Sequence, residues 1–257
     1  MKHDSIKKQQ SFYDSYWRKS SWKRKLAFVN KFHRESALSL LKKNKVDLNN
    51  EDNKIVDIGM GNSDLIFKFD KSQIFGYDIS QTAILNAQYH ANKIGKNPEH
   101  FIVGHPADKK AFFDGVFLIH ILEHVENPKS FIDTINMVMK PGSKLVVLIP
   151  INEPKTKVFR EIKQGYYNEL HKTKFSKDSV IKMLEEHFEI LDYYENNFLF
   201  EVINKAVKNN VPMYIALSYL MNLLSLIPFR LVKMLDEWLG KTGKFKPQQI
   251  GVLVLKS

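Results

Sequence analysis

Two histidines and a glutamate have side-chain types and a spacing that could support acid–base or metal chemistry. His120, Glu123 and His124 lie at positions i, i+3 and i+4, so a helical turn would place them on one face. An imidazole exchanges a proton near neutral pH, and imidazole and carboxylate groups are common ligands of divalent metals. The pattern therefore indicates a proton-transfer site or a metal site. The structural alternative is a set of hydrogen bonds that only holds a loop together.

A glycine turn after the first apolar run is a second place where chemistry is expected. In the segment KIVDIGMGNSD, a β-branched run ends at Asp57 and is followed by Gly59 and Gly61. Glycines let the backbone approach a ligand closely, while the next helix directs its N-terminus at that ligand. A second apolar run, 73–78, ends in Asp78, about 20 residues further on, where sheets of this kind place a carboxylate that accepts hydrogen bonds from ribose. These spacings indicate a nucleoside-containing cofactor.

The strands that must position these residues alternate with helical stretches along the chain. Alternation of this kind predicts an α/β fold with a Rossmann-like, doubly wound, mainly parallel seven-stranded sheet. Helices would cover both faces, and ligands would bind at the carboxyl ends of the strands. The predicted strands cover residues 54–57, 73–78, 100–104, 113–120, 144–149, 188–194 and 250–256.

The motifs at these strand ends resemble those of the class I S-adenosylmethionine-dependent methyltransferases. VDIGMG (56–61) is similar to the family's first motif and GYD (76–78) to its acidic second motif. ILEHVENP (121–128) is similar to the signature after the fourth strand, and KPGSKLVV (140–147) to the turn into the fifth. The resemblance covers roughly residues 50 to 195. The sequence LEHV (122–125) is most similar to that of the ubiquinone and menaquinone biosynthesis branch of the family.

The resemblance implies S-adenosyl-L-methionine as the cofactor and assigns the residues that contact it. The backbone of Gly59 and Gly61 would approach the methionine portion, Asp57 would hold its amino group, and Asp78 would hold the ribose. Other cofactor contacts are expected from the glycine turn, from the loops after later strands and from an N-terminal helix that closes over the pocket. These residues are Met60, Ile79, His105, Pro106, His120 and Tyr16, with Tyr13 and Trp17 as further lid residues.

Three residues depart from the family pattern, namely Met60, Ser63 and His105. His105 stands where many relatives carry an aspartate that meets the adenine amino group. A neutral imidazole could accept that hydrogen bond, but a protonated one could not. The departures keep open the alternative of a non-catalytic, methyltransferase-like binding protein.

Methyl transfer to a hydroxyl requires alignment and the loss of a proton, for which histidine is suited. The expected catalytic residues are His124 and His171, the latter similar to a histidine that the family often carries after the fifth strand. Some relatives hold a divalent metal with a Glu-x-x-Glu-His pattern. In this chain the corresponding metal ligands would be His120, Glu123 and His124, which favour a zinc-like ion because His120 replaces a glutamate. O-methylation is the simplest mechanism, and carbon or nitrogen acceptors stay open.

A nicotinamide cofactor is disfavoured by the composition of the first turn. Its fingerprint needs a third glycine, which is absent after Gly61. Asp64 also lies where a pyrophosphate would be repelled.

Three parts of the chain are predicted from composition and pattern. Residues 1–45 form an N-terminal helical cap in which aromatic and basic residues interleave. Residues 46–197 together with 248–257 form the cofactor-binding core, and residues 198–247 form a hydrophobic helical insertion before the last strand. The alternative for the N-terminal segment is a helix that only packs its aromatic residues on the sheet, and the alternative for the insertion is a helix pair that completes the core or forms a dimer contact.

The insertion indicates a lipophilic acceptor. Residues 209–229 carry no charge, yet this run is short for a spanning helix, which needs about 20 mostly apolar residues. An amphipathic helix is predicted over 229–239 and is expected to stop at Gly240. We expect these helices to cover the active-site mouth or to rest in an anionic membrane interface.

Composition and charge limit the partners. The net charge of +11 favours anionic partners such as lipid or RNA, and the uncharged segment favours lipid. The chain has no cysteine and its N-terminus lacks an apolar signal region, so a cytoplasmic location, peripheral on the membrane, is expected. The predicted function is O-methylation of a lipophilic or lipid-linked small molecule, with RNA methylation as the alternative enzyme activity. Nothing in the sequence indicates the oligomeric state.

Overall fold

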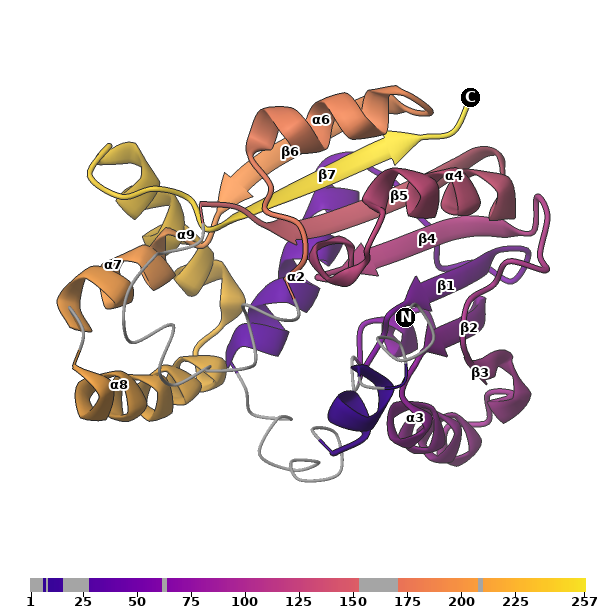
Figure 1. Ribbon diagram of the computed structural model, residues 1–257, viewed down its shortest axis with the longest axis horizontal. Coiled ribbons are helices and arrows are strands. Elements are labelled where there is room, and N and C mark those ends of the chain that lie inside the picture. Colours follow the sequence, from indigo (N-terminus) through magenta and orange to yellow (C-terminus); the bar gives the residue numbers. More distant parts are fainter. Residues whose placement is uncertain (1–6, 8, 16–27, 62–63, 153–170, 208–209) are drawn as a thin grey trace.

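The structure is a computed structural model in which a seven-stranded sheet lies between two layers of helices (Figure 1). It describes residues 7, 9–15, 28–61, 64–152, 171–207 and 210–257. The strand order is β3-β2-β1-β4-β5-β7-β6, and β7 runs antiparallel to both of its neighbours. The strands are β1 Lys54–Ile58, β2 Gln73–Asp78, β3 Phe101–Val103, β4 Phe113–Ile119, β5 Met139–Pro150, β6 Glu189–Asn196 and β7 Gln249–Leu255. The predicted Rossmann-like, mainly parallel fold is therefore confirmed.

The central strands are buried on both faces because helices cover the sheet on both sides. On one face, α2 (Phe28–Lys43) and α3 (Gln81–Lys93) pack on a core that includes Ile55 and Phe117. On the other face, α4 (Pro128–Val138) and α6 (Lys177–Glu185) pack on a core that includes Val116. Burial on both faces explains why these strands read as continuous apolar runs rather than as alternating ones.

Three helices begin at polar residues that cap their first turn. The side chain of Ser80 accepts a hydrogen bond from the Ala83 N–H at the start of α3. Asn127 caps α4 in the same way, and Ser176 forms a capping box at the start of α6. These caps satisfy backbone donors that a helix leaves unpaired, so they fix the point at which each loop after a strand turns into a helix.

Strand β5 begins earlier than the sequence predicts. The prediction opened it at residue 144 after the Pro-Gly turn, whereas it begins at Met139. The Pro-Gly turn lies inside β5, and it shifts the register of the pairing with β4 between Phe113 and Gly115. Gly142 has a φ of +77° there, and its N–H donates to the carbonyl of Lys256 at 2.8 Å.

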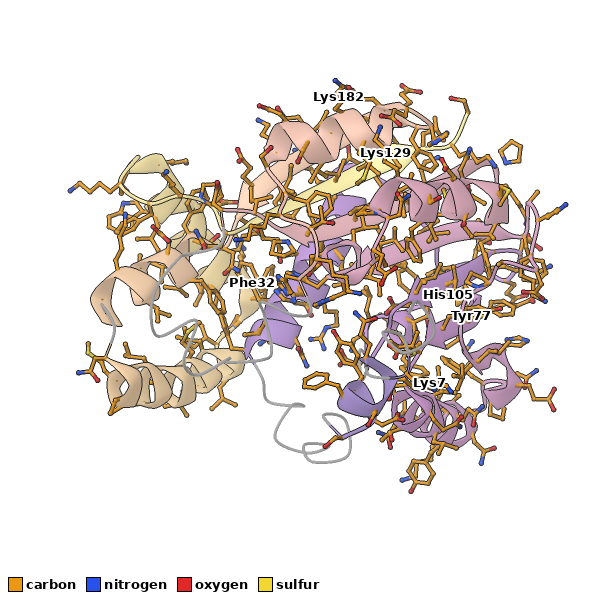
Figure 2. All side chains as sticks on the ribbon, in the orientation of Figure 1. Lys7, Phe32, Tyr77, His105, Lys129 and Lys182 are labelled. Carbon is orange, nitrogen blue, oxygen red and sulfur yellow. The ribbon has the colours of Figure 1, made fainter. Side chains whose placement is uncertain are left out.

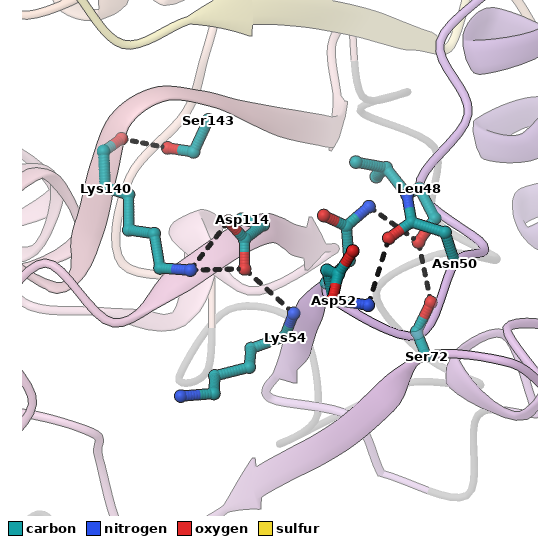
Figure 3. Close-up of polar contacts among 9 residues, drawn as sticks. Leu48, Asn50, Asp52, Lys54, Ser72, Asp114, Lys140 and Ser143 are labelled. Atoms are coloured by element: carbon teal, nitrogen blue, oxygen red, sulfur yellow. Dashed lines mark hydrogen bonds and ion pairs between the residues drawn. The ribbon is translucent and has the colours of Figure 1, made fainter.

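Polar contacts at the amino ends of the strands serve the fold rather than a site (Figure 3). The Asp114 carboxylate accepts a hydrogen bond from the Lys54 N–H at 2.9 Å and pairs with the Lys140 ammonium at 2.8 Å. Ser72 donates to the carbonyl of Leu48 at 2.7 Å. These contacts join β1, β4 and β5 at the edge opposite the carboxyl ends, and they leave those ends free to carry function.

The insertion between β6 and β7 is helical. It consists of α7 (Phe198–Val207), α8 (Val211–Leu223), a short 3₁₀ turn and α9 (Phe229–Lys241). Helix α9 ends one residue beyond the predicted stop at Gly240. That glycine lies against Phe198 instead, and a Cβ at this position would be 2.7 Å from the Phe198 ring.

The insertion packs on helix α2 through a small separate core. Phe28 and Phe32 of α2 are buried with Met221 of α8 and Val232 of α9. Within the described residues, no helix combines the length and the apolar character that crossing a bilayer requires.

A buried carboxylate fastens the insertion at its first turn. Asp236 of α9 is 2% exposed and accepts hydrogen bonds from the N–H groups of Asn197 (2.8 Å) and Leu199 (2.9 Å). We expect Asp236→Ala to lower the free energy of unfolding by about 1–3 kcal/mol, because two buried donors lose their acceptor. Urea unfolding measures this effect. The matched control is the exposed neighbour Glu237→Ala, expected to cost less than about 1 kcal/mol. Equal losses in the two variants would contradict this role for Asp236.

Candidate functional site

The glycine turn after β1 is fastened to the end of β2. The N–H groups of Gly59 and Met60 both donate to the carbonyl of Tyr77, at 2.8 and 3.2 Å. Gly59 and Gly61 have φ values of +73° and +51°, which lie in the left-handed region. Side chains other than glycine rarely adopt this backbone conformation, so the turn depends on these two positions.

The carboxylate of Asp78 holds two turns together. It is 8% exposed and accepts one hydrogen bond from the Gly61 N–H and one from the Ser80 N–H, each at 2.8 Å. Burial raises the pKa of Asp78, the two N–H groups oppose this rise, and the nearby charge of Asp14 adds to it. Each carboxylate oxygen keeps further acceptor capacity, so the group can also accept hydrogen bonds from a ligand hydroxyl.

The N-terminal helical segment 9–15 connects the two sides of this region. Asp14 accepts hydrogen bonds from the Ser80 hydroxyl (2.6 Å) and from the Thr82 N–H (3.0 Å) at the start of α3. On the other side, Gln9 donates to the carbonyl of His124 at 3.3 Å. The ring of Tyr13 lies edge-on to that of His124, with centroids 6.1 Å apart. The segment therefore spans the carboxyl ends of β2 and β4.

Two other lid residues predicted from sequence, Tyr16 and Trp17, lie outside the described residues. The sequence analysis did not identify Asp14 or Gln9. Both act through partners that are far away along the chain, and neither belongs to a motif.

Side chains around the glycine turn fill the core beneath it. Asp57 is 1% exposed and lies within β1. Met60 is 3% exposed and packs over Gly76, where a Cβ would overlap its sulfur. A Cβ at Gly59 would likewise overlap the side chain of Ile121. The side chain of Met60 is thus a core element, which leaves only its main chain to face the predicted ligand.

The remaining residues predicted for the cofactor follow β2 and β3. Ile79 is half-buried and Pro106 is buried. His105 retains substantial exposure, lies near the carboxyl end of the sheet (Figure 2), and faces the Phe131 ring edge-on at 5.9 Å. Its partial burial lowers the pKa of His105, which favours the neutral imidazole that can accept a hydrogen bond.

The charge of Asp64 is balanced by a partner. Arg34 of α2 forms an ion pair with Asp64 and a second one, at 2.9 Å, with Glu35. The repulsion of a pyrophosphate that the sequence predicted at Asp64 is therefore weakened. The missing third glycine remains the argument against a nicotinamide cofactor.

His120 is held tightly at the end of β4. Its backbone has a φ of +53°, and both ring nitrogens face acceptors, with Glu123 at 3.2 Å and Gln249 at 2.8 Å. Its ring also stacks on that of His33, with the centroids 3.9 Å apart. Burial places the pKa of His33 well below its usual value, and the charge of His120 lowers it further.

Glu123 is the buried centre of the histidine cluster. The glutamate is 1% exposed, and one of its oxygens lies 3.9 Å from Nε2 of His124. The carbonyl of Glu123 accepts a hydrogen bond from the Lys172 N–H at 2.8 Å, which brings His171 against the site. The rings of His124 and His171 are 4.7 Å apart and nearly perpendicular. Burial alone would raise the pKa of Glu123, but the hydrogen bond from His120 and the charges of His124, His120 and His171 lower it overall.

The geometry groups the possible metal ligands differently from the prediction. In the described part of the chain, Glu123, His124 and His171 offer ligand atoms within 4.8 Å of one another. The predicted set was His120, Glu123 and His124. His120 is not part of this group, although its Nδ1 lies 3.2 Å from Glu123; its Nε2 faces Gln249 and its ring stacks on that of His33.

The sequence analysis also missed His33 and Gln249. His33 was one of many basic and aromatic residues of the N-terminal region, and Gln249 begins the last strand. Their side chains reach the site only through the packing of α2 and the antiparallel insertion of β7. The arrangement as a whole offers a glycine turn and a carboxylate with spare acceptor capacity after β1 and β2, and two imidazoles beside a buried carboxylate after β4.

Comparison with known proteins gives three findings. Residues 24–189, more than half of the chain, match the family model described as Methyltransferase domain. A curated relative, the mitochondrial ubiquinone biosynthesis O-methyltransferase of Dictyostelium discoideum, is 27% identical over 120 residues. The match covers 41% of this chain and 37% of that relative, so the chain spans well under half of the relative's length.

Solved structures with similar folds have low sequence identity to this chain. The crystal structure of MccD protein has a TM-score of 0.58 at 11% identity, and the match covers 86% of this chain and 96% of that chain. Phosphoethanolamine N-methyltransferase 2 of Haemonchus contortus, in complex with S-adenosyl-L-methionine, has a TM-score of 0.57 at 16% identity. That match covers 86% of this chain and 52% of the other. At these identities the structural similarity is one of fold.

Gly59 is predicted to tolerate no side chain. Gly59→Ala combines a left-handed backbone with overlap on Ile121, so we expect affinity for S-adenosylhomocysteine to fall at least about tenfold in calorimetric titration. Gly95→Ala is the matched control, because Gly95 has a φ of +72° but no atom within 4 Å of its added Cβ. That control should lose about 1 kcal/mol of stability and keep its affinity. Unchanged affinity in Gly59→Ala would contradict the site.

Glu123 is predicted to stabilise the fold in a pH-dependent way. Its folded-state pKa lies below the unfolded value, so the stabilisation is present above about pH 4.3 and is lost as the pH falls through the folded-state pKa. We expect Glu123→Gln to lower the free energy of unfolding by about 1–3 kcal/mol at pH 7 and by much less near pH 3. Urea unfolding over this pH range measures the difference. The exposed Glu126→Gln serves as the control, and a pH-independent difference for Glu123→Gln would disprove the assignment.

Proposed function

The chain belongs to the methyltransferase domain family, a class I S-adenosylmethionine-dependent family, and from this premise we propose that it methylates a hydroxyl group of a lipophilic small molecule. The observation that carries the proposal is the pair of imidazoles, His124 and His171, beside the buried Glu123 at the carboxyl end of the sheet. A hydroxyl must lose its proton when it is methylated, and this pair is the group of the described residues suited to take it.

The cofactor is proposed to lie along the carboxyl ends of β1 and β2. When bound, S-adenosylmethionine supplies an electrophilic methyl group on a sulfonium. The main chain of Gly59 and Gly61 would line its methionine portion, and Asp78 would accept hydrogen bonds from the ribose hydroxyls while it braces both turns. His105 in its neutral form would accept from the adenine amino group.

The histidine pair is proposed to act as the base. A neutral ring nitrogen of His124 or His171 takes the acceptor's hydroxyl proton, while the oxygen is held in line with the methyl group. Glu123 is a positioning residue, because its buried negative charge favours the imidazolium that forms when the proton arrives. The Tyr13 ring against His124 would help to exclude water from this side.

A divalent metal is a second proposed use of the same cluster. Two imidazoles and one carboxylate, with ligand atoms within 4.8 Å of one another, are a donor set suited to a zinc-like ion. Glu123, His124 and His171 would hold such an ion, which would lower the pKa of a bound hydroxyl. His120 would stay outside the first coordination shell.

Two observations support a lipophilic acceptor over RNA. The curated relative is an O-methyltransferase of ubiquinone biosynthesis, although the match covers only part of that protein. In addition, the insertion presents exposed apolar side chains from α8 to α9, and its cations lie along one edge of α9. The positive net charge permits RNA but does not require it.

Methyl incorporation tests the proposal. We expect labelled methyl groups from S-adenosylmethionine to appear on an alkylated catechol, more slowly on the same catechol without its alkyl chain, and not on bulk RNA. Replacing the base, through His124→Gln or His171→Gln, should lower kcat by about 10²- to 10⁴-fold while affinity for S-adenosylhomocysteine stays unchanged.

The control variant is His187→Gln, which removes a histidine that pairs with Asp133 between α4 and α6, away from the cluster. It should retain full activity. Elemental analysis of the purified variants separates the two roles, since a metal site predicts loss of bound ion in Glu123→Gln, His124→Gln and His171→Gln alike. Full activity in both cluster histidine variants would rule out the proposed base, and incorporation into RNA alone would rule out the proposed acceptor.

A further inference from the structure

Helix α9 has a second apolar face that no described part of the chain covers. Leu231, Met234, Leu235 and Trp238 lie at i, i+3, i+4 and i+7, and they are 55%, 55%, 43% and 60% exposed. The opposite side of the helix, which includes Val232, faces the core shared with α2. An amphipathic helix needs only one apolar face to pack on its own protein, so the outer row is a second apolar surface that packing among the described residues does not use.

Further exposed apolar residues extend this surface along the chain. We call the whole set the outer apolar face. It consists of Leu220, Leu223, Leu226, Ile227, Leu231, Met234, Leu235 and Trp238. Leu226, in the turn between α8 and α9, is the most exposed of them at 72%. Exposed apolar surface concentrated in this way marks an interaction site.

The charges beside the outer apolar face are mainly positive. Arg230, Lys233 and Lys241 of α9 follow one another at i, i+3 and i+11, so they form a row along one edge of the apolar row. Lys31 of α2 adds a cation at the turn, where its ammonium donates to the carbonyl of Ile227 at 3.0 Å.

The acidic residues of the insertion offset this charge only in part, because Glu237 pairs with Lys233 while Arg230 and Lys241 add two further cations. Asp236 is buried, and Glu237 lies 3.7 Å from Lys233. The third acid, Glu201, is largely buried and accepts a hydrogen bond from Gln248. The exposed edge is therefore cationic next to an apolar surface.

We propose that the outer apolar face docks on the surface of an anionic phospholipid bilayer, with α9 lying in the plane of the interface. Leucine, methionine and tryptophan side chains would enter the boundary between headgroups and acyl chains, and the cationic row would meet the lipid phosphates. The helix docks without crossing the bilayer.

The positive charge beside the outer apolar face favours an anionic bilayer over a second copy of the chain as its partner. A symmetric dimer through the same face would bring equivalent surfaces together, so the cationic rows would lie close to each other and repel. Nucleic acid is a poor match as well, because Trp238 is the sole aromatic residue among the described side chains that make up the outer apolar face.

The docking face lies at the functional end of the molecule. Figure 1 shows α7, α8 and α9 beyond the edge toward which the arrowheads of β4 and β6 point. Phe32 lies on the side of α2 that faces the insertion (Figure 2), with its ring 5.7 Å from that of Phe229. A molecule leaving the bilayer at this face would thus be near the carboxyl ends of the strands. The docking proposal itself rests on the surface of the insertion and does not depend on the proposed reaction.

Vesicle flotation without cofactor or acceptor tests the proposal. We expect the full chain to float with vesicles of phosphatidylcholine and phosphatidylglycerol, and to float much less with phosphatidylcholine alone. The Leu235→Glu, Trp238→Glu double variant should lower the partition coefficient at least tenfold. Arg230→Glu with Lys241→Glu should abolish the preference for anionic vesicles, since each cation near such a surface contributes about fivefold.

The matched control is Leu85→Glu with Tyr89→Glu. These residues of α3 are 54% and 65% exposed and lie one helical turn apart, as Leu235 and Trp238 do, but they lie outside the insertion. Circular dichroism verifies that each variant is folded. Absence of flotation, or equal loss in the control and in the insertion variant, would overturn the proposal. A dimer in light scattering that only Leu235→Glu, Trp238→Glu dissociates would overturn it in favour of a second copy.

Discussion

The carboxylate of Asp78 accepts hydrogen bonds from the backbone of two turns, and the structure at the carboxyl ends of β1 and β2 depends on these contacts. Gly61 donates from the turn after β1, and Ser80 donates from the turn after β2. Ser80 also caps α3 and donates to Asp14, which brings the N-terminal segment into the same network. A buried carboxylate is costly unless donors surround it, so the glycine turn, the start of α3 and the N-terminal segment stabilise one another through a single group.

Glu123 plays a corresponding part at the other end of the site. Its side chain faces His120, His124 and His171, and its carbonyl accepts a hydrogen bond from the segment that carries His171. The two carboxylates differ in what surrounds them. Backbone N–H groups contact Asp78, which fixes the geometry of the two turns, whereas imidazole side chains contact Glu123, as the proposed proton transfer requires. In the N-terminal segment, Gln9 contacts the histidine region and Asp14 contacts the start of α3, so the segment holds the two regions in a fixed relative position.

Much of the fold and of the cofactor end could be predicted from the sequence, because both depend on local patterns. Apolar runs predicted all seven strands, and the glycines and Asp78 follow directly from their ends. The histidine cluster could be predicted only in part. Spacing placed His120 beside Glu123, and its Nδ1 does lie 3.2 Å from that carboxylate, but its contacts with Gln249 and His33 arise only when β7 and α2 are packed. The pairing of Asp64 with Arg34 was likewise invisible, since the two residues lie on different elements.

Consecutive residues of α2 contact different functional regions. Phe32 packs on Phe229 of the insertion, while His33 stacks on His120 at the site. Adjacent positions on a helix move as one rigid unit, so a displacement of the insertion that moves α2 also moves the His33–His120 stack. If a ligand at the insertion displaces α2, its binding and binding at the site would share one coupling free energy. By thermodynamic reciprocity, the factor by which a ligand at the insertion changes affinity at the site equals the factor by which a ligand at the site changes affinity at the insertion.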